Sequence, residues 1–208
     1  AVRVTASKEW MNAEERAYPV VIDPTLKVKA YMGNSSEEKI YSTYVTEGRP
    51  RQNNYGYSLM PVGYETGSGL KECRIYLGIS KLPTLPANSV MVNAELKLRQ
   101  HGFSYATGSS NKITVGIYEV GSEYTGSSVK SWIEGLTWNG RPAVSSSELL
   151  DYMVCSNGSI NDDFRLNITR TVAKWYTRSI PAGGLELRKI SEGNDPAYAT
   201  MLGYTLGG

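Results

Sequence analysis

Hydrophobic and polar positions alternate along three segments of the chain, residues 73–79, 90–101 and 112–120. Successive side chains of a strand point to opposite faces, so this period of two predicts strands with one face toward a core. In residues 73–79, Arg74 and Tyr76 fall on the face opposite the core. The predicted inward positions of the three segments are Cys73, Ile75, Leu77, Ile79, Val92, Ala94, Leu96, Leu98, Ile113, Val115 and Ile117.

Shorter apolar runs between turn residues predict further strands. They cover residues 18–25, 40–45, 58–63, 164–168, 185–190 and 198–204. Thr169 precedes a helical stripe of Val172, Trp175 and Tyr176, which predicts one short helix with Thr169 as its N-cap. Many short strands with one small helix predict an all-β fold, an antiparallel β-sandwich or jelly roll.

One domain accounts for most of the chain. The sequence shows no internal repeat, and 208 residues suffice for a single large β-sandwich. We expect a lead-in segment at residues 1–25, which contains the strand YPVVIDPT, and a β-sandwich domain at residues 26–208. The first and last residues read as those of a piece cut from a longer protein, so flanking domains are expected neighbours.

Two of the four tryptophans lie in the short stretch SWIEGLTWNGRP, residues 131–142. If both of its flanks are extended, Trp132 and Trp138 face the same side and close one end of a core. We therefore interpret this stretch as a corner between two sheets and assign Trp132, Trp138 and Trp175 to the core.

Composition excludes some partners. The chain has 22 basic and 20 acidic residues, a net charge of +2, which is too balanced to predict a nucleic-acid partner or an acidic membrane surface. No apolar run is long enough to span a bilayer. Fifteen tyrosines against two phenylalanines are typical of the exposed sheets and polar loops of a secreted or cell-surface protein.

The two cysteines, Cys73 and Cys155, are far apart and lack a metal-binding spacing. They can form a disulfide or remain two thiols. Because Cys73 lies in an alternating strand, we favour its burial as a small hydrophobe.

The sequence does not predict a catalytic site. His101 is the only histidine and falls at the outward end of a strand. Paired carboxylates can hydrolyse glycosides without histidine, and Glu134, Asp151, Asp162 and Asp163 are available. No spacing sets two of these acids opposite one another, so we predict that the protein is not an enzyme.

No cofactor or metal is predicted. Asn161, Asp162 and Asp163 could supply oxygen ligands to a structural calcium ion, but they lack the alternating acidic pattern of a calcium loop. The simpler interpretation is a turn in which these side chains bond to the local backbone.

Ligand binding is the stronger functional prediction. Sugars are held by aromatic rings and nearby polar side chains, and acidic sugars add contacts from arginine or lysine. The loop at residues 47–57 combines these types, and the outward face with Lys97, Arg99, His101 and Tyr105 adjoins it if the fold brings them together. The alternative is that these tyrosines only rim the sandwich. The predicted ligand-binding residues are Arg49, Arg51, Asn53, Tyr55, Tyr57, Arg99, His101 and Tyr105, with Asn54 and Lys97 beside them.

Six segments, in order, resemble the DNRLRE domain, a jelly-roll module related to a family of carbohydrate-binding modules. They are NYG at 54–56 with the strand end at 62–63, CRIYLGISKLP at 73–83, VNAELKL at 92–98, SWIEGLTWNGRP at 131–142, LNITRTVAKW at 166–175 and GLELR at 184–188. They follow one another in the right order between residues 54 and 188, although each one alone is weak. YPVVIDPT is similar to the lead-in that precedes such domains in Rhs or YD-repeat wall-associated proteins.

This resemblance implies a non-catalytic, carbohydrate-binding-like module of a large secreted or cell-surface bacterial protein. Its partner would be a polysaccharide or cell-wall glycan. The alternative is a structural or adhesive spacer in a surface or exported Rhs-type protein, with no glycan ligand. The chain departs from the family at Gly78 and Ile79, where the family usually carries a Phe-Asp pair, so any role of that acidic position does not transfer.

Overall fold

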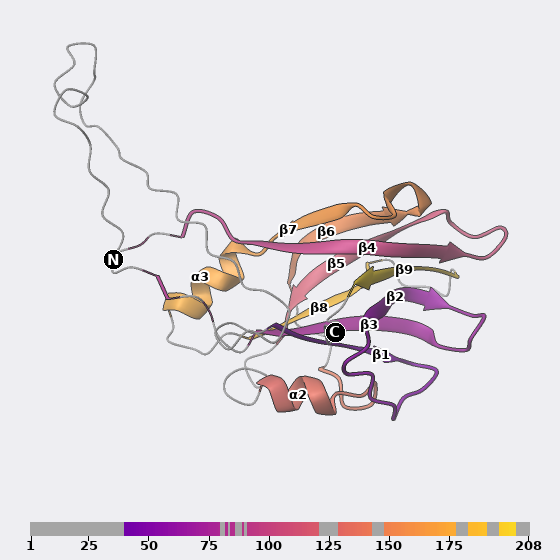
Figure 1. The fold of residues 1–208 in the computed structure, drawn as a ribbon, viewed down its shortest axis with the longest axis horizontal. Coiled ribbons are helices and arrows are strands. Elements are labelled where there is room, and N and C mark those ends of the chain that lie inside the picture. Colours follow the sequence, from indigo (N-terminus) through magenta and orange to yellow (C-terminus); the bar gives the residue numbers. More distant parts are fainter. Residues whose placement is uncertain are drawn as a thin grey trace, which may run out of the picture.

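The computed structural model describes residues 40–79, 82, 84–85, 89, 91–120, 129–142, 148–177, 183–190 and 196–202 (Figure 1). The expected lead-in segment and its boundary with the domain lie outside the described residues. Within them, the chain forms a nine-stranded antiparallel sheet with two α-helices, which confirms the predicted all-β fold. Of the two α-helices, the one at Val129–Gly135 was not predicted.

The described part of the chain contains the following strands and helices, in chain order. The strands are β1 (Ile40–Thr46), β2 (Leu59–Glu65), β3 (Lys71–Ile79), β4 (Glu95–Tyr105), β5 (Lys112–Glu119), β6 (Leu149–Ser156), β7 (Asp163–Asn167), β8 (Gly184–Lys189) and β9 (Ala197–Leu202). The helices are α2 (Val129–Gly135), the 3₁₀ turn η2 (Asn157–Ser159) and α3 (Thr169–Thr177).

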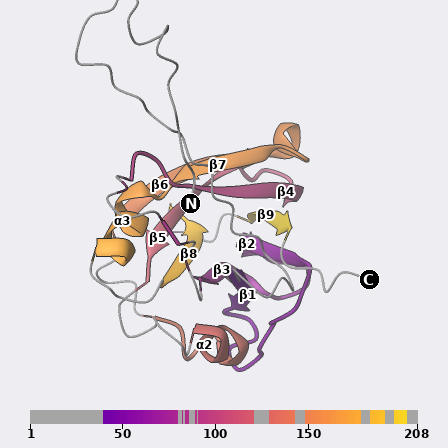
Figure 2. The ribbon, with the colours of Figure 1, turned by 60° about the vertical axis from the view of Figure 1, so that its left-hand side comes forward.

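β3 is the point at which the sheet divides. β1 pairs along one edge of β3, from Cys73 to Ile79. Cys73 also pairs with Gly63 of β2, and Ile75 pairs with Leu187 of β8, so β2 and β8 must share the opposite edge. Two branches start there, β2-β9-β4-β7 and β8-β5-β6, and they curve over a common interior (Figures 1 and 2).

The two ends of the branches, β6 and β7, are joined through side chains. Gln100 is fully buried at the irregularity in β4 and donates its amide hydrogen to the carbonyl of Ser156, 2.7 Å away. Its amide oxygen accepts a hydrogen bond from Ser159, and its backbone bonds to Asn161 and Asp162. At the other end of this seam, the backbone nitrogen of Asn167 donates to the carboxylate of Asp151 at 2.7 Å. Both branches are thereby held closed around the interior.

The interior core contains almost all the predicted inward side chains. Nine of them are buried, from Cys73 and Ile75 in β3 to Ile117 in β5. Val92 is the clear exception, with 79% of its surface exposed, because β4 begins only at Glu95. Trp175 is buried in this core, as predicted.

The outer face of β3 is buried as well, which the sequence did not predict. Tyr76 and Val45 lie there in a second hydrophobic cluster with Ile133, Leu136 and Trp138. Tyr76 is fully buried and Arg74 nearly so. The alternation in residues 73–79 therefore separates two cores, and neither face of β3 is left to solvent.

The cover of this second core is the stretch predicted to be an extended corner. That prediction is wrong, because residues 129–135 form the helix α2 (Figure 2). Val129, Ile133 and Leu136 recur at the spacing of one helix face, and all three are buried. Trp132 and Trp138 therefore pack on the outer cluster and do not close the end of the inner one.

Two glycines, paired across β3 and β8, let α2 approach the sheet. A Cβ atom on Gly78 would lie 2.5 Å from Val129 and 2.7 Å from Ile133, and one on Gly184 would lie 2.6 Å from the Trp132 ring. Such distances are far below van der Waals contact, so only glycine fits under the helix. This close approach is the physical reason for glycine at positions 78 and 184.

The predicted helix after β7 is present as α3, but its start differs in detail. Asn167 accepts the backbone hydrogen of Thr169 through its side-chain oxygen, and the Thr169 hydroxyl accepts from the backbone nitrogen of Ala94 at 2.9 Å. Thr169 is thus the first residue of the helix and a link to the chain before β4, while Asn167 supplies the local side-chain bond.

Replacing Gly78 with alanine is expected to destabilise the fold by about 1–3 kcal/mol, because its new methyl group overlaps Val129 and Ile133. Urea unfolding measures the change. Gly102→Ala is the matched control, since a Cβ there meets Thr200 at an ordinary 3.7 Å. Adding Val129→Ala to Gly78→Ala should recover part of the loss. Equal effects of Gly78→Ala and Gly102→Ala would contradict the close helix approach.

Cys73 and Cys155 are unpaired, fully buried thiols, so the favoured burial of Cys73 is confirmed. Burial raises the pKa of each thiol to about 12, and for Cys73 the carboxylates of Glu65 and Glu72 add to the effect. At pH 8 only roughly one thiol in ten thousand is then ionised. A thiol reagent should label neither cysteine in the native protein and both after unfolding in guanidinium; rapid native labelling would contradict their burial.

Candidate functional site

The loop between β1 and β2, predicted to bind a ligand, is anchored by its two asparagines. Asn54 is buried and donates from its side chain to the carbonyl of Tyr44 at 3.0 Å. Asn53 donates to the carbonyl of Leu136, just after α2, and its oxygen accepts the backbone hydrogen of Tyr55. The Tyr55 ring packs against the outer hydrophobic cluster. These three side chains therefore hold the loop in place.

Three other predicted residues of this loop remain at the surface. Arg49 and Arg51 are exposed, and 52% of Tyr57 is exposed. The Tyr57 ring meets the Tyr44 ring edge-on, with centroids 5.8 Å apart. Burial raises the pKa of the Tyr44 hydroxyl, Tyr57 and Cys73 raise it further, and the charge of Arg49 opposes this. The loop therefore exposes one aromatic ring and two guanidinium groups.

The predicted residues of β4 do not share one face. Lys97, Arg99 and His101 are exposed, and Lys97 pairs with Asp163 of β7 at 2.7 Å. The register of β4 against β9 shifts between Gln100 and Gly102, which reverses the faces beyond this point. Tyr105 therefore lies on the side of Phe103, its ring neighbour at 5.9 Å, and the predicted common face of Arg99, His101 and Tyr105 is wrong.

The β4 residues and the loop at residues 47–57 lie on different parts of the molecule. β9 and β2 separate β4 from β3 in the sheet, and the loop follows β1 on the far edge of β3. Figures 1 and 2 both show β4 on the side opposite β1 and α2. Arg49, Arg51 and Tyr57 are thus exposed on one loop, while Arg99 and His101 lie on a different part of the molecule. Whether either group binds a ligand stays a prediction.

The acidic turn considered for calcium is organised by other bonds. A hydrogen bond from Lys97 lowers the pKa of Asp163 against a smaller effect of burial, and Asn161 adopts a left-handed backbone, with φ of 71°. Asp162 contributes its backbone to the seam at Gln100. Among the residues that the structure describes, no group of three or more His, Cys, Asp or Glu side chains could hold a metal ion.

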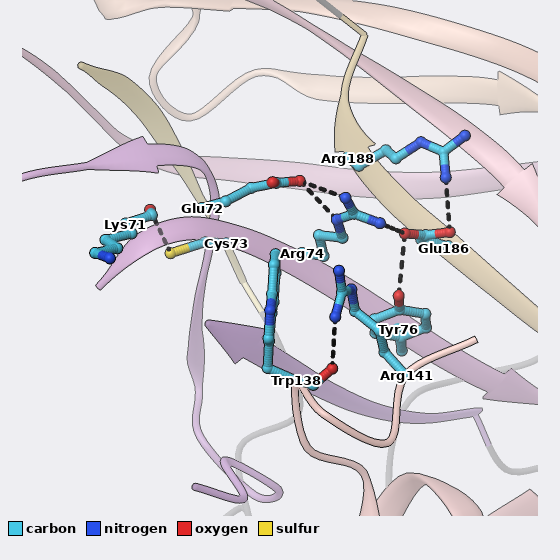
Figure 3. A network of polar contacts seen from close by, with 9 residues as sticks. All are labelled: Lys71, Glu72, Cys73, Arg74, Tyr76, Trp138, Arg141, Glu186 and Arg188. Atoms are coloured by element: carbon cyan, nitrogen blue, oxygen red, sulfur yellow. Dashed lines mark hydrogen bonds and ion pairs between the residues drawn. The ribbon is translucent and has the colours of Figure 1, made fainter. Parts of the chain in front are cut away.

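The most extensive polar cluster lies on the outer face of β3 and β8 (Figure 3). Glu186 is its centre, with a side chain only 4% exposed. One carboxylate oxygen accepts from Arg74 and from the hydroxyl of Tyr76, both at 3.0 Å, and the other accepts from Arg188 at 3.2 Å. Arg74 also pairs with Glu72 at 2.6 Å. Every oxygen of the buried carboxylate is therefore engaged.

Aromatic rings complete this cluster. Arg141 lies 3.8 Å and Arg74 5.2 Å from the centre of the Trp138 ring, and Arg188 lies 3.7 Å from that of Tyr118. Burial lowers the pKa of Arg141, and neighbouring Arg74 lowers it further. Burial also acts to lower the pKa of Arg74, but the bond to Glu72 and the charge of Glu186 outweigh it and raise the value. The rings thus shield guanidinium groups that are partly removed from water.

This cluster ties the segment after α2 to the sheet. Arg141 donates to the carbonyl of Trp138 at 2.7 Å, and Asn139 donates its backbone hydrogen to Pro50 in the predicted ligand loop. Arg74 was not predicted as part of a site because the alternation in residues 73–79 placed it opposite the core, and Glu186 and Arg188 lie in a predicted strand whose faces were not assigned. The signal that could have found them is the apolar stripe of α2, which requires a sheet face to cover.

No protein-family profile matches the chain, and no curated protein matches it significantly. No helix in the described residues is long and apolar enough to cross a membrane. The site is therefore interpreted from its own geometry.

Glu186→Ala is expected to cost about 3–5 kcal/mol, because Arg74 keeps its charge in a buried position after losing a partner. The control is Glu95→Ala, which removes an exposed ion pair with Arg165 and should cost under about 1 kcal/mol. Urea unfolding followed by tryptophan fluorescence reports both stability and the surroundings of Trp138. A loss for Glu186→Ala as small as that for Glu95→Ala would contradict a structural role of the cluster.

Proposed function

We propose that this domain is a non-catalytic, carbohydrate-binding-like module of a large secreted or cell-surface bacterial protein. Its ligand is an acidic polysaccharide, which binds at the loop of Arg49, Arg51 and Tyr57. The observation that carries this proposal is the exposure of these three side chains on a loop whose two asparagines already bond to Leu136 and Tyr44. The resemblance of the six sequence segments to the DNRLRE domain supports the same class.

The loop is preorganised for this task. Asn53 and Asn54 fix its backbone to Leu136 and to Tyr44, so little further ordering is needed on binding. Tyr57 offers an apolar ring face with a polar tip, suited to the face and hydroxyls of a pyranose. A guanidinium group binds a carboxylate through two parallel hydrogen bonds, which makes a uronate the favoured sugar.

A structural or adhesive spacer is the second candidate. It is favoured by the separation of Tyr55, Tyr57 and Tyr105, which do not gather around one groove. In that case the buried cluster around Glu186 would serve only to stiffen the domain.

Calorimetry with polygalacturonate and alginate oligosaccharides, and with a neutral β-glucan as the reference, tests the proposal. Binding to the uronates is expected to weaken roughly tenfold or more in Arg51→Ala, because a charged hydrogen bond is lost. Arg99→Ala removes the same charge from exposed β4 and should leave affinity nearly unchanged.

Two results would overturn this assignment. The first is no uronate binding by the intact domain at millimolar ligand, which would leave the spacer as the better description. The second is an equal loss in Arg51→Ala and Arg99→Ala, which would mean that the ligand responds to net charge alone.

A further inference from the structure

The outer face of β6 exposes an unusual row of apolar side chains. Leu149, Tyr152 and Val154 are 42%, 57% and 44% exposed, and Ile190, directly after β8, is 37% exposed. Single exposed apolar residues are common on protein surfaces, whereas neighbouring ones mark contact sites. Neither the predicted loop nor the cluster around Glu186 includes these four residues.

Strand register places these side chains next to one another. Val154 is opposite Thr114 of β5, whose carbonyl accepts the backbone hydrogen of Ile190. Tyr152 is opposite Gly116, which in turn is opposite Arg188 of β8. The row therefore extends across β6, β5 and β8.

Gly116 lets neighbouring side chains pack directly on the backbone at the centre of this face. A Cβ atom there would lie 2.7 Å from Leu149 and 2.9 Å from the Tyr118 ring, so both side chains lean over the bare backbone. Arg188 stacks on the Tyr118 ring at 3.7 Å. The result is a shallow platform of aromatic and aliphatic groups with Tyr152 as its most exposed ring.

A shallow, open cavity of about 360 Å³ lies beside this platform. Leu149 lines both, and the cavity is otherwise lined by Glu148, Leu150, Asn167, Ile168, Thr169 and Arg170. Glu148 and Arg170 form an ion pair there. The cavity therefore offers hydrogen-bonding groups next to the apolar side chains of the platform.

Size decides which occupant fits. Three neighbouring strands span only about 10 Å, whereas a standard protein interface buries about 800 Å² on each partner. Four partly exposed side chains fall well short of such an interface, which disfavours a second copy of the chain. An exposed tyrosine ring with aliphatic neighbours and nearby hydrogen-bonding groups matches the apolar face and the hydroxyls of a pyranose ring.

We infer that the outer face of β6, β5 and β8, centred on Tyr152, is a platform for pyranose rings of a polysaccharide, with the adjoining cavity holding hydroxyl groups. This inference rests on the proposed glycan-binding function and adds a second contact surface to it. The platform acts by stacking and the loop at residues 47–57 by charge, so the two respond differently to salt.

The experiment compares variants at about 50 mM and about 500 mM NaCl, because salt screens exposed charges and leaves stacking nearly unchanged. Binding of polygalacturonate, alginate and cellohexaose is measured by calorimetry. Tyr152→Ala is expected to weaken binding at least fivefold at both salt concentrations, while Tyr152→Phe keeps the ring and binds like the native protein. Ile160→Ala, which removes a similarly exposed apolar side chain elsewhere, should have no effect.

The outcomes separate this inference from the proposed function. If Arg51→Ala loses affinity and Tyr152→Ala does not, the platform is refuted and the glycan-binding loop stands. If the native domain binds none of the three glycans, the proposed function is overturned, and the inference that rests on it is overturned as well. Sedimentation velocity covers the remaining case: self-association that Tyr152→Ala abolishes would make this face a homodimer contact and overturn the inference.

Discussion

β3 is hydrogen-bonded to strands on both of its edges and packed against a hydrophobic core on each of its faces. The rest of the structure is arranged around these contacts. β1 occupies one edge of β3, and β2 and β8 share the other edge, so both branches of the sheet begin at β3. The inner face of β3 supplies Ile75 and Leu77 to the interior core, while its outer face supplies Tyr76 to the cluster under α2. From Cys73 to Ile79 every residue of β3 is buried, so a polar side chain in this part of the strand cannot simply be hydrated.

The charged cluster follows from that burial. Arg74 lies on a covered face, so it needs compensating charges, and Glu72 and Glu186 provide them. Tyr76 and Arg188 complete the bonding of Glu186, and Trp138 lies against two guanidinium groups. This network also fixes the segment after α2, which contacts the loop of Arg49 and Arg51 through Asn139 and Asn53. The surface proposed to bind a ligand is therefore supported from beneath by buried ion pairs.

Local patterns predicted the inner core well, because alternation depends only on strand geometry. Ile75, Leu98 and Val115 are buried as their positions require. The outer core was not predicted, since a stripe of Val129, Ile133 and Leu136 is too short to stand out and glycines at 78 and 184 gain meaning only when a helix is seen above them. The predicted outward face of β4 was wrong for a related reason. One extra residue near His101 reverses the side to which Tyr105 points, and the alternation pattern does not show where this extra residue lies. For the predicted ligand residues, composition identified the loop, but only the contacts of Asn53, Asn54 and Tyr55 separate anchors from exposed groups.

The bond between Asn54 and Tyr44 has a consequence for how such a domain behaves in crowded surroundings. β1 has one strand neighbour among the described residues, and a strand with an open side can recruit a strand from another molecule. The amide of Asn54 occupies a carbonyl of β1 that such an intruder would need, and the turn at Arg49 occupies the carbonyl of Thr46. Two hydrogen bonds from a single loop thus occupy backbone acceptors on the open edge of β1. This hinders pairing with a strand of another molecule and so protects against aggregation.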